Sequence, residues 1–138
     1  MGKINLQKVL VSGLVAGVVL NVIDYMAYGV IFAATFPLQP GAKGLLGLPI
    51  IPWFIVVDFL VGIMLVYLYA AIRPRFGAGP KTAFFAGLLM WLMVGLLHAL
   101  GEAPVAIGAP PQFYTIGTLI SLVALPLGAV AGAKFYSE

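Results

Sequence analysis

Four long apolar runs make up most of this chain, and the short segments between them are rich in proline, glycine and charge. A helix needs about 20 apolar residues to cross the hydrocarbon core of a bilayer, and each run is close to or above that length. The pattern predicts an all-α, polytopic membrane protein in which four transmembrane helices form an up-down bundle, as a single domain over 1–138. The helices are expected at about 9–35, 53–72, 82–101 and 113–133.

The three connecting segments differ in character. Residues 36–52 contain four prolines and three glycines and predict an apolar loop that lies along the membrane surface or caps the bundle. Residues 73–81 carry three of the seven basic residues, two prolines and two glycines, and predict a tight basic turn. A second proline-rich loop is expected over 102–112. The first run could also be a cleaved signal peptide, but its apolar character continues past Asp24 to a spanning length, which favours a helix.

Composition supports the membrane interpretation. The chain is 63% hydrophobic and 8% charged, whereas a soluble domain is about 45–50% apolar and about 25% charged. The net charge of +3 comes from residues at the ends of predicted helices, so nucleic acid is not an expected partner. The chain has no cysteine, which excludes disulfides, thiolate nucleophiles and cysteine metal ligands.

The distribution of lysine and arginine predicts an orientation. Basic residues collect on the cytoplasmic side of short membrane loops. Of the seven in this chain, only Lys43 falls on one side, and six fall on the other: Lys3, Lys8, Arg73, Arg75, Lys81 and Lys134. Both termini are therefore expected in the cytoplasm.

Small residues recur at helical spacing on three of the predicted spans. In lipid, glycine and alanine let helix backbones approach closely, so such stripes indicate helix contacts. The contacts could be within one chain or between copies in a homo-oligomer. The residues expected to carry them are Gly13, Gly17, Gly87, Gly95, Ala124, Gly128 and Gly132.

The first and third spans also share a spacing of small and polar residues. The steps of 4, 4, 3 and 4 residues follow one face of an α-helix and suggest a possible 2+2 helix repeat. The alternative is that small and polar residues gather on the inward face of any bundle helix. The two series are Gly13, Gly17, Asn21, Asp24 and Tyr28, and Gly87, Trp91, Gly95, His98 and Glu102.

Four ionisable residues, Asp24, Asp58, His98 and Glu102, lie within or at the end of the spans. At 1.5 Å per residue, Asp24 and His98 are each roughly 24 Å across a core of about 30 Å. All four are placed in the outer third of the bilayer. They predict a polar binding site there, with Asn21 and Tyr28 on the same helix face as Asp24.

Three interpretations of this polar site remain open. A carboxylate at the bilayer centre costs about 2.5–3.5 kcal/mol, so it must be paired, protonated, hydrated or bound to a cation. Asp24 and Asp58 could form a structural lock with His98, Asn21 or tyrosines. They could handle protons or cations, or join His98 and Glu102 around a divalent metal, for which mixed nitrogen and oxygen ligands suit several ions.

The aromatic residues near the predicted helix ends, Tyr25, Tyr28, Trp53, Phe113 and Tyr114 among them, are interpreted as an interfacial belt. Trp91 lies in the middle of the third span. It is expected to serve in packing rather than as a ligand platform.

Three stretches of the chain resemble a group of small, four-span bacterial inner-membrane proteins of uncharacterised function. They are Gly-Leu-Val-Ala-Gly-Val-Val-Leu-Asn-Val-Ile-Asp (13–24), Tyr-Ala-Ala-Ile-Arg-Pro-Arg-Phe-Gly-Ala-Gly-Pro-Lys-Thr-Ala (69–83), and the ending Gly-Ala-x-x-Tyr-x-Glu (132–138). The resemblance implies a multi-pass protein of the bacterial inner membrane but no reaction or cofactor. The group often has an acidic residue in the fourth helix, whereas this chain has none there before Glu138.

The functional hypothesis from the sequence is a binding or structural membrane protein, either an accessory subunit or a homo-oligomer. Its expected partners are the lipid bilayer and other membrane subunits or a second copy. The alternative is a small proton- or cation-coupled transporter or channel that uses Asp24, Asp58 and His98. An enzyme is not expected, because there is one histidine and no catalytic motif, and no cofactor is predicted.

The orientation can be tested by cysteine labelling, because the chain has no cysteine of its own. We expect Lys43→Cys to react with a membrane-impermeant maleimide in intact cells. Ala78→Cys, in the basic turn, should react only after the membrane is permeabilised. The opposite pattern would place the termini outside.

Overall fold

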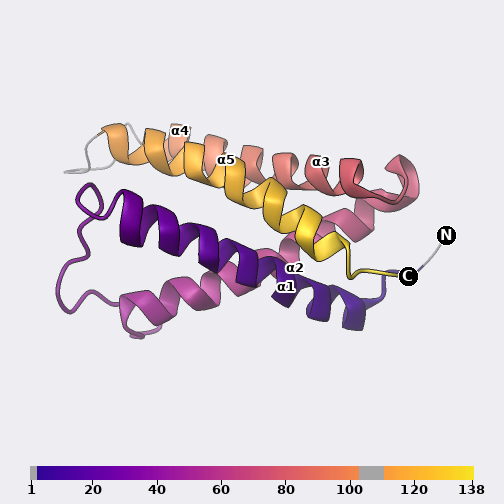
Figure 1. The fold of residues 1–138 in the computed structure, drawn as a ribbon, viewed down its shortest axis with the longest axis horizontal. Coiled ribbons are helices and arrows are strands. Elements are labelled where there is room, and N and C mark those ends of the chain that lie inside the picture. Colours follow the sequence, from indigo (N-terminus) through magenta and orange to yellow (C-terminus); the bar gives the residue numbers. More distant parts are fainter. Residues whose placement is uncertain (1–2, 103–110) are drawn as a thin grey trace.

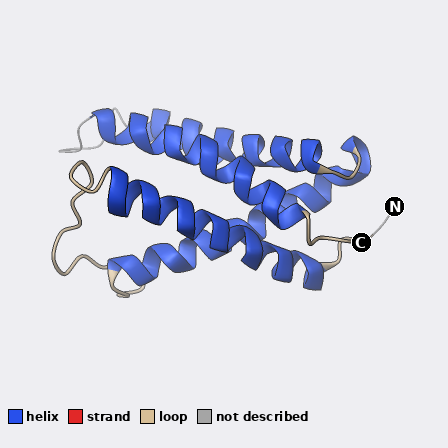
Figure 2. Ribbon diagram, in the orientation of Figure 1, coloured by secondary structure: helices blue, strands red, loops and turns tan. Residues whose placement is uncertain are grey.

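The computed structural model describes residues 3–102 and 111–138, and these form a bundle of four helices that are long and apolar enough to cross a membrane (Figures 1 and 2). This confirms the predicted all-α, multi-pass architecture. The described residues contain no β-strand, only an isolated bridge between Lys43 and Pro49. The spans are Leu6–Ile31, Ile50–Phe76, Pro80–Glu102 and Pro111–Ala133.

Two of the four spans change from α-helix to π-helix along their length. The π-helix, with its i→i+5 bonds, is rare and appears mostly as single turns that are frequent at functional sites. In order, the elements are α1 (Leu6–Asp24), η1 (Tyr25–Ile31, π), α2 (Ile50–Phe76), α3 (Pro80–Met90), η2 (Trp91–Leu97, π), α4 (His98–Glu102) and α5 (Pro111–Ala133).

The first helix begins three residues earlier than the apolar pattern predicted. Asn5 is the N-cap, and its side-chain oxygen accepts a hydrogen bond from the backbone N–H of Lys8 at 3.1 Å. Such a cap satisfies one of the free donors at a helix start. Gln7 and Lys8 are therefore helical although they lie outside the apolar run.

The basic turn is shorter than the sequence suggested. The expected helix end at residue 72 is incorrect, because α2 continues through Pro74 and Arg75 to Phe76. Pro74 lies in the last turn, where Arg73 and Arg75 also complement the negative end of the helix dipole. The chain reverses only over 77–79. There Gly77 and Gly79 have φ of 85° and 133°, a region that favours glycine.

The loop between η1 and α2 is held by backbone hydrogen bonds. The N–H of Gly44 donates to the carbonyl of Leu48 at 2.8 Å, and that of Ile50 donates to Ala42 at 3.0 Å. The ring of Trp53 lies directly against Gly44, where a side chain would overlap it. The second helix starts at Ile50, three residues before the predicted position at residue 53. Most of the other predicted proline-rich loop, 102–112, lies outside the described residues.

The helices are not equally close to one another. α1 packs against α2 and α5, and α3 packs against the same two helices. α2 and α5 touch across the middle of the bundle, and no extensive interface joins α1 to α3 in the part of the chain that the structure describes. The first and third spans therefore lie on opposite sides of a central α2–α5 contact.

Glycines bring α1 and α2 into backbone contact. A Cβ at Gly62 of α2 would lie 2.5 Å from the carbonyl oxygen of Gly13 and 2.8 Å from Cα of Gly17. A Cβ at Gly13 would lie 2.5 Å from Cα of Ile63. Atoms do not approach this closely, so the crossing depends on the missing side chains.

Other small residues place α5 against its neighbours. A Cβ at Gly132 would lie 2.9 Å from the carbonyl oxygen of Ser12, and one at Gly128 would meet Leu20 at 3.1 Å. Gly87 of α3 faces the backbone of α5 at Pro126, and Ala124 is 3% exposed. These contacts are within the chain.

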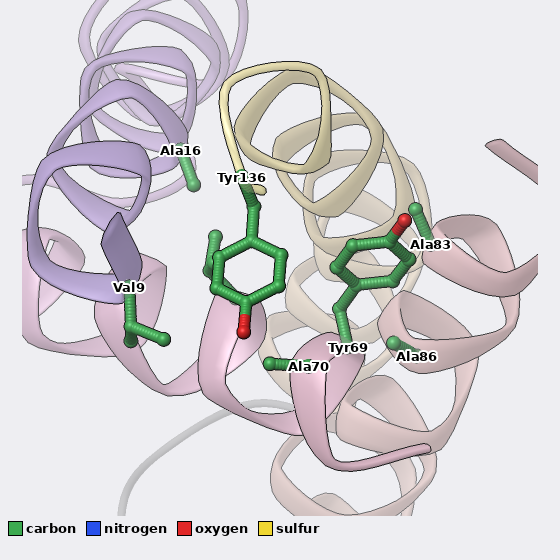
Figure 3. Packing of buried hydrophobic residues seen from close by; sticks show 8 residues of the cluster. Val9, Ala16, Tyr69, Ala70, Ala83, Ala86 and Tyr136 are labelled. Carbon is green, nitrogen blue, oxygen red and sulfur yellow. The ribbon is translucent and has the colours of Figure 1, made fainter. Parts of the chain in front are cut away.

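At the end of the bundle that holds both termini, two tyrosines fasten the helices together (Figures 1 and 3). The rings of Tyr69 and Tyr136 meet edge to face with centroids 6.0 Å apart. The hydroxyl of Tyr69 accepts a hydrogen bond from the N–H of Gly79 at 3.1 Å, and that of Tyr136 accepts one from Asn5 at 3.3 Å. The Arg73 guanidinium lies 5.6 Å from the centre of the Tyr136 ring. This end is a packed core that ties both termini to the α2–α3 turn.

The glycine contact predicts a stability difference between two Gly→Ala variants. Gly62→Ala should lower the unfolding free energy in detergent by about 1–3 kcal/mol, because a methyl group there meets backbone atoms that cannot rotate away. Gly101→Ala is the control, since a Cβ at Gly101 meets no atom within 4 Å in the part of the chain that the structure describes. Equal stability of the two variants would contradict the close crossing.

Candidate functional site

A cavity of about 950 Å³ lies at the end of the bundle opposite the termini. It occupies the space between the first span and α2, which diverge toward this end after crossing at their glycines (Figure 1). The loop residues 36–38 and the beginning of α5 contribute to its wall. The lining residues are Val18, Asn21, Val22, Asp24, Tyr25, Met26, Tyr28, Gly29, Phe36, Pro37, Leu38, Ile51, Phe54, Ile55, Asp58, Phe59, Phe113 and Gly117.

Two carboxyl groups face each other in this cavity. Asp24 is the last residue of α1 and Asp58 lies in the first half of α2, and their side chains are within hydrogen-bonding reach. Both residues are partly buried. No lysine, arginine or histidine is among the described residues that line the cavity. The carboxyl pair therefore has no basic partner in the cavity wall.

Asn21 connects the two helices beside the pair without binding it. Its side-chain amide donates to the carbonyl of Gly17 at 2.9 Å and to that of Ile55 on α2 at 3.4 Å. Among the described residues, no hydrogen bond joins either carboxyl to Asn21, His98 or a tyrosine. The structural lock envisaged with those partners is not formed, and the near neighbour of each carboxyl is the other.

Aromatic rings form the wall of the cavity toward α5. Tyr28 and Phe36 meet edge to face with centroids 5.0 Å apart, and Phe36 and Phe113 are 4.5 Å apart. Phe36 is only 9% exposed although it belongs to a loop. The sequence predicts that Tyr28 and Phe113 belong to an interfacial belt, whereas the structure places both in the cavity wall.

The cavity is open on the side that faces away from the bundle. Several of its apolar side chains are largely exposed, including Val22 at 58%, Ile51 at 57% and Phe54 at 52%. In a membrane-spanning bundle, an exposed apolar side chain at this level faces lipid. The opening between the first span and α2 is therefore directed at the bilayer.

The structure does not bring His98 and Glu102 to this site. Both are exposed on α4, and neither lines the cavity. The first reason is the α2–α5 contact, which separates the first span from the third. The second is η2, which precedes His98: a π-helical turn holds more residues than an α-helical one, so the face that carries Gly87 does not continue to His98.

In the first span the π-helical segment follows Asp24 instead of preceding it, so Gly13, Gly17, Asn21 and Asp24 remain on one α-helical face. That face is turned to α2 rather than to the third span. Tyr28 lies within η1 and still reaches the cavity. In the predicted 2+2 repeat, Asp24 of the first span corresponds to His98 of the third. The π-helical segment follows Asp24 but precedes His98.

The metal hypothesis lacks a ligand set. Within residues 3–102 and 111–138, no group of three or more His, Cys, Asp or Glu side chains is placed to hold a metal ion. The Asp24–Asp58 pair offers two carboxyls, and His98 and Glu102 do not join it.

Trp91 has the packing role expected of it. Its indole N–H donates to the carbonyl of Thr118 on α5 at 2.9 Å, and its ring covers Gly95. It packs beside the buried cluster around Leu20 and Leu65 rather than in the cavity.

Sequence reasoning missed most of the apolar wall. Phe36, Phe54, Phe59 and Gly117 carried no recognisable signal, because an apolar residue on a membrane helix can face lipid, a neighbour or a cavity. The available signal was the apolar, proline-rich loop, whose length allows the ends of two consecutive helices to stand apart.

No known protein family, curated protein or solved structure matches this chain.

The geometry predicts which acidic and basic residues are coupled. In double-mutant cycles on unfolding free energy, Asp24→Asn and Asp58→Asn should be non-additive by more than about 0.5 kcal/mol, because the two side chains touch. Asp24→Asn and His98→Ala should be additive to within about 0.5 kcal/mol. Additive effects of the two Asp variants, together with coupling between Asp24 and His98, would mean that Asp24 is paired with His98 and would contradict this geometry.

Proposed function

We propose that this multi-pass membrane protein binds a proton or a cation at the Asp24–Asp58 pair. The observation that supports the proposal is that two carboxyl groups from different helices meet in an apolar cavity whose described lining has no basic residue. Buried charges in proteins are paired or coordinate cations, and intramembrane acids commonly mark ion or substrate paths. This favours the hypothesis of a proton- or cation-handling site, formed by Asp24 and Asp58 without His98.

A proton and a cation would compete for the pair. A carboxylate has no hydrogen to donate, so two carboxyls can share a hydrogen bond only when one of them is protonated. Two adjacent negative charges in a medium of low dielectric repel strongly, and such pairs hold one proton between them. A bound cation can replace that proton. Apparent cation affinity should therefore rise with pH, and the other titratable groups that line the cavity are Tyr25 and Tyr28.

The proposed setting is the bacterial inner membrane with both termini in the cytoplasm. Support comes from the basic residues: six of the seven lie beside the start of α1, the α2–α3 turn and the end of α5, and only Lys43 lies in the loop between η1 and α2. In this orientation the cavity lies in the outer half of the bilayer. The protein then acts by binding and releasing a cation rather than as an enzyme.

A second candidate is a structural role in a larger membrane assembly. The observation in its favour is the open side of the cavity, where Val22, Ile51 and Phe54 are exposed. A second copy or another membrane subunit could cover that opening. In that case the purified protein would have the mass of an oligomer, and substitutions at Ile51 or Phe54 would reduce it to a monomer.

Infrared spectroscopy tests the proton-binding pair directly. Wild-type protein in lipid at neutral pH should show the C=O stretch of a protonated carboxyl, because two adjacent carboxyls in a medium of low dielectric hold one proton between them. The Asp24→Asn/Asp58→Asn double variant should lack this band, and Glu102→Gln, whose side chain lies outside the cavity, should keep it. Identical spectra for the wild type and the double variant would contradict the proposal.

A further inference from the structure

The feature that goes beyond a simple ion site is the size and lining of the cavity. Its volume of about 950 Å³ is at the upper end of the roughly 300–1,000 Å³ typical of small-molecule pockets. A proton or a dehydrated metal ion would leave nearly all of this space unfilled. Because most of the lining is apolar, the space is better suited to a hydrocarbon group than to hydrated ions.

The charge of the cavity limits the occupant further. Asp24 and Asp58 are the only charged side chains among the described residues that line it. A phospholipid would bring a phosphate toward these carboxyls, which is unfavourable. A molecule with a positive centre and an apolar body matches both the acids and the wall.

The aromatic residues supply a second means of recognising a positive centre. The faces of tyrosine and phenylalanine rings attract organic cations, and the attraction is stronger where the contact excludes water. Tyr28 lies close to both carboxyls and packs on Phe36, which in turn packs on Phe113. The acids and the rings thus come from η1, α1, α2, α5 and the 36–38 loop around one space.

From the volume, the charge and the ring wall we infer that the occupant is a hydrophobic organic cation, which enters from the bilayer between the first span and α2. This inference rests on the proposed function, because it names the class of cation that the Asp24–Asp58 pair would bind. The route follows from the exposed side chains at the opening, which include Val22 and Ile51. A ligand with an apolar body is already concentrated in the lipid on that side.

The test uses tetraphenylphosphonium as the probe and equilibrium dialysis against the full-length protein in detergent. Tetraphenylborate, an anion of the same shape, controls for partition into apolar surface. We expect saturable binding of the cation only, with a proton released on binding. Asp24→Asn/Asp58→Asn should weaken binding of the cation by about tenfold or more, because it removes the only charged side chains among the described residues that line the cavity.

A cavity-filling variant separates the role of the apolar wall from that of the acids. Among the described residues, a Cβ at Gly117 would meet only the Tyr28 hydroxyl, at 3.4 Å, so Gly117→Leu should fold and occupy part of the cavity. It should weaken binding of the probe while keeping the infrared band of the carboxyl pair. Gly101→Leu is the matched control and should bind normally, because a Cβ there meets no atom of the described residues within 4 Å.

The outcomes distinguish this inference from the proposed function. If the probe does not bind saturably but the protonated-carboxyl band is present and lost in the double Asp variant, the organic-cation inference is wrong and the ion-binding proposal stands. If that band is absent as well, both fail. Equal uptake of tetraphenylphosphonium and tetraphenylborate, or binding that is insensitive to Gly117→Leu, would also overturn the inference.

Discussion

The backbone contact between α1 and α2 determines the shape of this bundle. Gly13 and Gly17 lie against Gly62 and Ile63 so closely that a single methyl group would not fit. Two straight helices that touch at one level must separate away from it, and here they separate toward the loop that joins them (Figure 1). The cavity exists because the crossing lies toward the other end and the 32–49 loop is long enough to span the gap.

The two ends of the bundle are consequently built by different means. At the end with the termini, small residues and the Tyr69–Tyr136 pair fill the space between helices, and both hydroxyls bond to backbone N–H groups (Figure 3). At the other end, large apolar side chains line a space instead of filling it. The packed end holds the helices in place, and the open end presents the Asp24–Asp58 pair.

The number of spans and their class could be predicted from the sequence because hydropathy over about 20 residues is a strong signal. Helix ends are less well defined by the sequence: Asn5 caps a helix whose first turn includes Gln7 and Lys8, and Pro74 lies inside a last turn rather than after it. At the site, the rise per residue predicts similar depths in the bilayer for Asp24 and Asp58, and the structure brings these two residues together. Depth also placed His98 there, but η2 changes the helix face before that residue. A single sequence gives no sign of where a π-helical turn will form.

The crossing of α1 and α2 also makes the width of the cavity sensitive to the crossing angle. From Gly17 to the end of η1 at Ile31 the first span extends roughly 20 Å beyond the contact, at about 1.5 Å per residue. A rotation of about ten degrees at the glycines would move that far end by roughly 4 Å, comparable to the thickness of an aromatic ring. Because Tyr69 and Tyr136 fasten the opposite end, a change in the crossing angle would alter mainly the width of the cavity. The 18 residues between Ile31 and Ile50 join these two ends of the helices.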